Sequence, residues 1–404
     1  MSADRSPAVV ASPEGHPRNI SLGYLKAFLT LLVVLHHTLL AYASFAPPLQ
    51  PRLDASLLWT AFPIVDPQRW SIAGLIAGFN DTFFMSLMFL LSGVFAWPSL
   101  ARKGAVTFAC DRLFRLGLPF VLAAALLAPL AYYPTWLASP ANGESFWHTW
   151  LRLGAWPAGP AWFLWVLLGF GALAALLAQL APGFGVRLGS ITGRLGQHPS
   201  AFFLCLVLAS ALLYLPMAAV FNPLRWLHAG PFFVQISRLP HYLLYFLVGI
   251  GIGAHGASRG LLQADGALAR RWPLWLLLSL LMFFASLCLL ALIFASMPKG
   301  GPAPWLVVLG NFSFVLSCAS TSFMLLALFT RFVHRAGRVA DHLAANAYGI
   351  YLLHYAAVTW LQVGLLHAAW PAPAKAGMVF VAAVAASWLV SALLRRIPVI
   401  ARLL

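Results

Sequence analysis

The chain has 404 residues, of which 62% are hydrophobic and only 8% are charged, whereas soluble domains carry about 25% charged residues. This composition argues against a water-soluble fold. The apolar runs are continuous rather than alternating, so they predict membrane-spanning helices and not a β-barrel. The net charge of +16 does not indicate nucleic-acid binding, because the sequence does not interleave basic residues with aromatics in a soluble segment.

Residues 1–19 are polar and rich in Pro, Ser and Ala, so they are predicted to form a disordered cytoplasmic tail. The first apolar run, 22–43, ends in Ala41-Tyr42-Ala43, which resembles a small-x-small cleavage site. A signal peptide is therefore an alternative for this run. Its length and its two histidines favour a helix that is retained.

Ten apolar runs are long enough to cross a hydrocarbon core, which takes roughly 20 residues per helix. These runs are 22–43, 76–98, 113–137, 160–181, 201–222, 239–256, 273–297, 305–330, 343–367 and 376–394. One set of alternate loops holds 18 of the 25 cations, and the opposite set holds Arg52, Arg69, Arg152, Arg225, Arg238, Lys299 and Lys375. By the positive-inside rule, we expect an all-α membrane bundle of about ten transmembrane helices with both termini in the cytoplasm. Residues 20–404 are predicted to form this single domain.

Tryptophans gather in or beside the loops that are predicted to lie outside. They are Trp59, Trp70, Trp136, Trp147, Trp150, Trp156 and Trp226. An aromatic belt at the membrane interface would explain them. The alternative is a surface on which sugar rings stack, supplied by the loops 44–75 and 138–159.

Ionisable residues inside a predicted span are costly and mark functional candidates. Lys26 and His37 are eleven residues apart in the first run, so on a helix they lie within about 20° of one face and ~16 Å apart. A polar stripe would then lead from the cytoplasmic mouth to a buried imidazole, which is the usual general base. The alternative for the pair His36-His37 is an interhelical hydrogen bond that holds the bundle together.

Asp81 is the best partner for His37 in the sequence. Counting helical rises from opposite ends places Asp81 near the depth of His37, so a His–Asp pair is predicted. The alternative is that Asp81 caps the N-terminus of its helix, and one residue can serve in both ways. The sequence contains no metal-ligand cluster and no Gly-rich phosphate loop, so no metal site is predicted.

Five blocks in the chain resemble the acyltransferase 3 superfamily of integral membrane acyltransferases. They are Lys26 to His37, Phe89 to Phe95 with its Ser92-Gly93, Asp111 to Pro119 with its Arg112 and Arg115, Trp162-Phe163-Leu164, and Asn346 to His354. The family's first helix carries an arginine, ten residues and a histidine. Lys26 departs from that pattern.

The resemblance implies transfer of an acetyl, succinyl or similar group from acyl-CoA to a carbohydrate hydroxyl, in the bacterial cytoplasmic (inner) membrane. It leans toward the branch that includes the succinyl transferases of periplasmic glucans. His37 would be the general base. Lys26, Arg112 and Arg115 would bind the phosphates of the donor, although a lysine acts as a point charge where an arginine binds bidentately. Acyl-CoA is the expected donor substrate, and no bound cofactor is expected.

Two more residues are candidates for the site. His354 is predicted about mid-membrane in the ninth run, where it could stabilise an oxyanion or simply be a packed, hydrogen-bonded histidine. Ser92 could line the same cavity. Because the donor is inside and most glycans are outside, the base must be reachable from both faces.

A secondary transporter or flippase for a glycan or lipid-linked precursor is the alternative function. It predicts paired broken helices and symmetry between halves, whereas the polar residues here concentrate in the first two spans and the turn after them. Adjacent helical residues diverge by about 100°. We therefore expect His37 to carry the chemistry, and His36 to face lipid or another helix.

Overall fold

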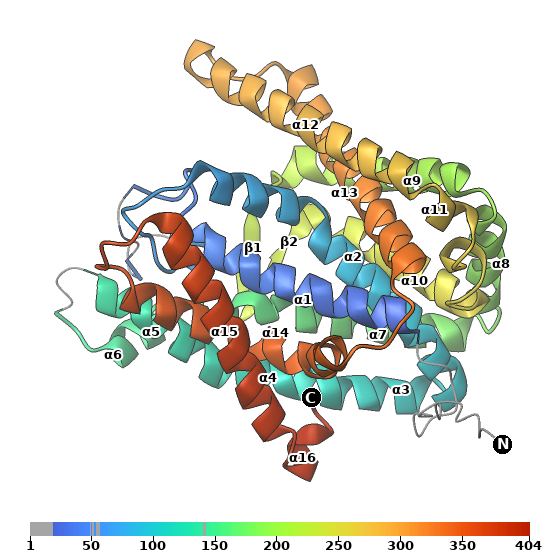
Figure 1. Cartoon of the computed structure of the whole chain (residues 1–404), viewed down its shortest axis with the longest axis horizontal. Helices are drawn as coiled ribbons and strands as arrows, with labels where there is room; N and C mark the ends of the chain where they lie inside the picture. Colours follow the sequence, from blue (N-terminus) through green and yellow to red (C-terminus); the bar gives the residue numbers. More distant parts are fainter. Residues whose placement is uncertain (1–18, 49, 51, 54–56, 140–142) are drawn as a thin grey trace, which may run out of the picture.

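A computed structural model of the chain describes residues 19–48, 50, 52–53, 57–139 and 143–404. The predicted tail lies outside the described residues except for Asn19. The described part is helical apart from one antiparallel hairpin, which confirms the all-α class (Figure 1). The elements are α1 Ile20–Leu40, α2 Ser71–Lys103, α3 Ala105–Arg112, α4 Leu118–Leu122, α5 Ala128–Ala138, α6 Phe146–Arg152, α7 Trp162–Leu180, α8 Phe184–Gly196, α9 Pro199–Phe221, β1 Trp226–Ala229, β2 Phe232–Gln235, α10 Leu239–His255, α11 Ala267–Arg270, α12 Trp272–Ser296, α13 Pro304–Phe332, α14 Arg338–Gly364, α15 Ala372–Leu394 and α16 Pro398–Ala401.

Nine helices in the described part are long and apolar enough to cross a membrane. One of them, Ala105–Ala138, is continuous because two π-helical segments join α3, α4 and α5. These nine match nine of the ten predicted runs. The tenth run forms α14, a 27-residue helix that is less apolar because it carries Asn346, His354 and Gln362, all three of which are buried. The protein is a multi-pass membrane protein.

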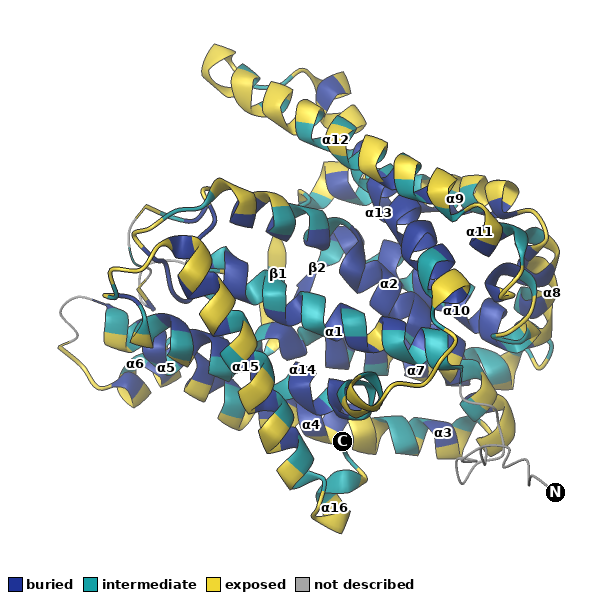
Figure 2. Ribbon diagram, in the orientation of Figure 1, coloured by how far each residue is buried: buried dark blue, intermediate teal, exposed yellow. Residues whose placement is uncertain are grey.

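Helix α1 lies in the middle of the bundle and packs against α2, α13, α14 and α15 (Figure 1). Its Leu22, Leu25 and Leu29 are fully buried. A central, buried position is what a retained first helix requires. By contrast, α12 is exposed over most of its surface and projects from the bundle (Figure 2), as expected for a helix that faces lipid.

Helices α2 and α10 cross so closely that only glycine fits at the crossing. A Cβ at Gly93 would overlap the carbonyl oxygen of Phe246, and one at Gly249 would overlap that of Leu90. Small residues allow such close approach of helices in membranes. The Ser92-Gly93 block therefore has two uses, since Gly93 permits the crossing while Ser92 lies on another face of α2.

The loops on the predicted outer side pack into an aromatic cluster. Trp59 and Trp150 are 0% and 4% exposed, and both pack against Tyr132. They form neither a membrane belt nor a sugar-stacking surface, so both interpretations were wrong for these two residues. The sequence could not show this, because the rings are buried by one another. Trp147 remains largely exposed.

A buried ion pair fastens the same outer region to α15. Lys375 Nζ lies 2.8 Å from Asp66 Oδ2, and the two side chains are only 1% and 2% exposed. Lys375 Nζ also donates to the carbonyl oxygen of Leu366. Lys375, which the sequence analysis assigned to an outer loop, thus belongs to a buried ion pair.

Candidate active site

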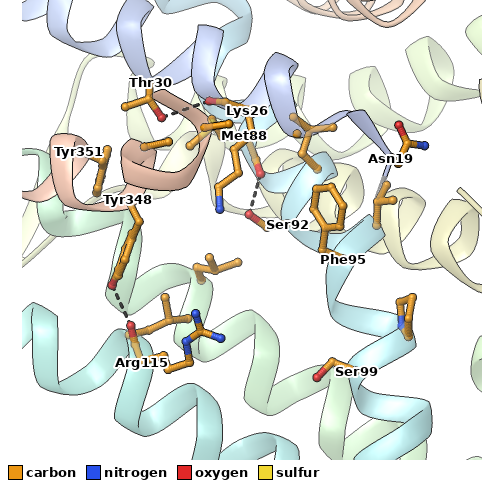
Figure 3. A pocket seen from close by; sticks show the side chains of 18 of the residues that line it. Asn19, Lys26, Thr30, Met88, Ser92, Phe95, Ser99, Arg115, Tyr348 and Tyr351 are labelled. Carbon is orange, nitrogen blue, oxygen red and sulfur yellow. Dashed lines mark hydrogen bonds between the residues drawn. The ribbon is translucent and has the colours of Figure 1, made fainter. Parts of the chain in front are cut away.

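A cavity of about 710 Å³ opens between α1, α2, α3, α7 and α14 on the side predicted to be cytoplasmic (Figure 3). Four residues that were predicted for the site lie on its wall. They are Lys26, Ser92, Arg112 and Arg115. Segments far apart in the sequence therefore meet where a donor was expected to bind.

The cavity carries positive charge without matching counterions. Lys26 is exposed to the cavity and interacts electrostatically with both Arg112 and Arg115. Among the described residues, no carboxylate lies within ion-pair distance of these three cations. The two aspartates on the wall are engaged elsewhere, since Asp111 pairs with Lys103 at 2.5 Å and Asp341 accepts a hydrogen bond from Tyr24. Such a site suits an anionic ligand.

A π-helical segment, Leu113–Gly117, carries Arg115. Pro119 has no backbone N–H, so the carbonyl oxygen of Arg115 four residues earlier loses its helical donor. The hydroxyl of Tyr348 supplies the missing hydrogen bond at 2.7 Å (Figure 3). π-Helical turns are frequent at functional sites. Here the turn is held against α14 on the cavity wall.

Ser92 lies on the cavity wall facing Lys26 (Figure 3), and its hydroxyl donates to the carbonyl oxygen of Met88 at 2.8 Å. The hydroxyl still has lone pairs to offer to a ligand. Its part in the reaction stays a prediction.

His37 lies beyond the inner end of the cavity, whose lining on α1 ends at Thr30, two turns earlier. Its ring centre lies 5.4 Å from that of His354 and 4.9 Å from that of Tyr355. Its Nδ1 is buried and has no hydrogen-bond partner among the described groups. His37 therefore faces α14, and its neighbours are another imidazole and a phenol.

The tautomer of His354 follows from its hydrogen bond. Its Nδ1 lies 2.7 Å from the carbonyl oxygen of Tyr351, which can only accept, so Nδ1 carries the proton. In the neutral ring Nε2 is then an acceptor, and it is buried without a partner among the described groups. A neutral His354 cannot donate to an oxyanion through Nε2. It is suited to accept a hydrogen bond. His354 is buried and bonded to Tyr351, as the alternative of a packed, hydrogen-bonded histidine predicted.

Asp81 is not an N-cap, because α2 begins at Ser71, ten residues earlier, and its N-cap residue is Trp70. Nor is its carboxylate paired with His37. Arg238 binds it in a bidentate manner, with Nη1–Oδ1 at 3.1 Å and Nη2–Oδ2 at 2.8 Å.

The two neighbouring histidines turn to different helices, as their angular separation requires. His36 packs against Phe84 of α2 and interacts electrostatically with Asp81. His37 turns to α14 instead, which is why the predicted dyad does not form. Arg238 is the site residue that the sequence analysis missed, because it was counted as a loop cation. The available signal was an arginine at the start of a span in a chain with few acidic partners.

The family model described as an acyltransferase domain, acyltransferase 3, matches residues 19–392. No curated protein and no solved structure matches the chain significantly. The family match covers nearly the whole chain, including every candidate residue described above. It identifies a membrane-embedded acyltransferase, which takes an acyl group from a donor and passes it to an acceptor. The chain belongs to the acyltransferase 3 family.

Proposed function

We propose that the protein transfers an acetyl, succinyl or similar acyl group from acyl-CoA to a hydroxyl of a carbohydrate or glycan-containing acceptor, at the bacterial cytoplasmic membrane. One observation carries this proposal. Three cations without counterions line a cavity at one end of the α1 stripe, and a histidine lies at the other end.

The shape of coenzyme A suits this arrangement. Its phosphates would bind Arg112, Arg115 and Lys26, with the arginines as bidentate partners and the lysine as a point charge. The inner end of the cavity is lined by apolar side chains such as Met88 and Phe163, which suit a slender pantetheine arm. Lys26 and His37 are ~16 Å apart along α1, a distance that the extended pantetheine arm would span.

His37 would act as the general base. The acceptor oxygen attacks the thioester carbonyl carbon as its proton passes to His37, so that a C–O bond forms and the C–S bond breaks. The departing thiolate then takes the proton, which yields an ester and free coenzyme A. The acceptor atom Nε2 of His354 would orient His37 and stabilise its protonated form, which is the part first expected of Asp81.

Tyr351 lies beside His354, with 6.0 Å between the two ring centres. It lines the cavity, and its hydroxyl donates to the carbonyl oxygen of Pro160. The thioester must pass this side chain to reach His37. A closed passage would keep water from the activated acyl group in the absence of donor.

Mass spectrometry of surface glycans tests the proposal. Cells with and without the protein should differ by the mass of one acyl group on a glycan. The purified enzyme should release coenzyme A from acetyl-CoA or succinyl-CoA when a glucose oligosaccharide is added. Identical glycan masses, together with no acceptor-dependent release, would contradict the proposal.

A further inference from the structure

Two ion pairs on the predicted outer side have the same N–O distance, 2.8 Å, but differ in the exposure of their side chains. In the pair Asp66–Lys375 both side chains are closed off, at 2% and 1% exposed. In the pair Asp81–Arg238 the guanidinium is only 6% exposed while the carboxylate is 45% exposed. The second pair is therefore open on the carboxylate side alone.

The open side of this pair does not belong to the lipid-facing surface of α2. Asp81 lies within about 20° of Met88 and Ser92 around the helix, because seven or eleven steps separate them. Both of those residues line the donor cavity. The exposed apolar residues Ile72 and Leu75 lie about 180° and 120° away from Asp81. Asp81 thus shares the helix face of the cavity, nearer to the outer side.

A polar group with an unpartnered nitrogen lies near the pair. His36 is half-buried, interacts electrostatically with both members, and has no hydrogen-bond partner for Nδ1 among the described groups. Phe314 holds the guanidinium of Arg238 by a cation–π contact at 4.7 Å. The arginine is held in place, and His36 offers a spare hydrogen-bonding nitrogen near it.

The chemistry of the pair suits a neutral ligand. Arg238 occupies one lone pair on each oxygen of Asp81, and each oxygen keeps a further site that can accept from a hydroxyl. The pair carries no net charge, unlike the donor cavity. We propose that Asp81, held in place by Arg238, binds the hydroxyls of the acceptor, which approaches from the outer side, and holds one hydroxyl toward the histidines of α1. This assignment rests on the proposed function, and it makes Asp81 an acceptor-binding residue.

Kinetics of charge-neutral variants test the assignment. Asp81→Asn and Arg238→Gln should raise KM for a β-linked glucose oligosaccharide at least tenfold, and leave KM for acetyl-CoA within twofold. Asp66→Asn is the matched control, since it removes the carboxylate of an ion pair that has the same N–O distance. It should lower the melting temperature without changing KM for the oligosaccharide. An oligosaccharide KM that stays within twofold in Asp81→Asn overturns the proposal.

Cysteine accessibility tests the same site without turnover. The background variant replaces Cys110, Cys205 and Cys288 by serine, because these are the exposed thiols of the described part. Asp81→Cys is combined with Arg238→Gln so that no buried charge is left unpaired. A membrane-impermeant maleimide added outside should label position 81. It should not label the control, Asp66→Cys combined with Lys375→Gln, which likewise leaves no buried charge unpaired. No labelling at 81, or labelling only from the cytoplasmic side, overturns the proposal.

Ser92→Cys in the same background separates the two proposals. It should react only in inverted vesicles, and coenzyme A should slow its labelling. If coenzyme A does not slow the labelling of Ser92→Cys, the donor cavity and the proposed function are contradicted. Labelling at position 81 reports on the acceptor site alone.

Discussion

The inner and outer halves of the bundle handle charge in opposite ways. The inner cavity exposes Lys26, Arg112 and Arg115, which have no counterion in the described part of the chain. On the predicted outer side, Lys375 and Arg238 are each paired with an aspartate. Unpaired cations attract an anion, and a neutral pair offers hydrogen bonds to a neutral polyol. Under the two proposals, the bundle would bind two chemically different substrates from its two sides.

The largest effect is expected at the meeting point of the two halves. His37→Gln should reduce turnover by about 10²- to 10⁴-fold, which is the usual cost of losing a general base. His36→Gln is the neighbouring control and should keep turnover within a few-fold at saturating acceptor. The measurement is acyl transfer at matched amounts of folded protein. Near wild-type turnover in His37→Gln would show that the base lies elsewhere.

A change at the crossing of α2 and α10 should disturb both halves together, because α2 carries Ser92 and Asp81 while Arg238 directly precedes α10 as its N-cap residue. Gly93→Ala inserts a Cβ into the carbonyl of Phe246 and should cost about 1–3 kcal/mol of stability. Gly78→Ala is the control on the same helix, since its Cβ would have no neighbour within 4 Å. Thermal unfolding in detergent measures the difference. Equal melting temperatures would mean that the crossing relaxes without cost.

Removing an inner cation should affect the donor alone. Arg112→Ala or Arg115→Ala should raise KM for acyl-CoA about tenfold, because a charge-assisted hydrogen bond contributes about 1.5–3 kcal/mol. Turnover at saturating donor should change little, as expected for uniform binding remote from the reacting atoms. Initial rates against acyl-CoA concentration provide the measurement. If KM is unchanged in both variants, these arginines serve topology only.

The smallest effect is expected at Tyr348. Tyr348→Phe removes the side-chain donor to the carbonyl oxygen of Arg115 and should cost about 1 kcal/mol of stability. The π-helical turn would then hold Arg115 less firmly, so KM for acyl-CoA should rise about two- to threefold. A thermal scan and donor kinetics on the same preparation measure both. A change in KM for the acceptor, in place of a change in KM for acyl-CoA, would contradict the assignment of Tyr348 to the donor half.

Much of the inner site could be predicted from the sequence. Lys26 and His37 share a face of α1 because the helical period is local, and the arginine turn follows directly from the end of α2. The partners of the outer charges could not be predicted. Arg238 is 157 residues from Asp81, and Lys375 is 309 residues from Asp66. Neither pairing has a local pattern that would reveal it.

The sequence by itself determined that this chain is a helical membrane protein with a polar stripe in its first helix, because hydropathy and helical period depend only on neighbouring residues. Tertiary structure decided which groups meet. Close packing of α2 on α10 brings Asp81 within hydrogen-bonding distance of Arg238. Contact of α1 with α14 places the ring of His37 next to that of His354. A buried charge or imidazole takes the partner that packing brings within reach, and packing depends on residues far apart in the chain.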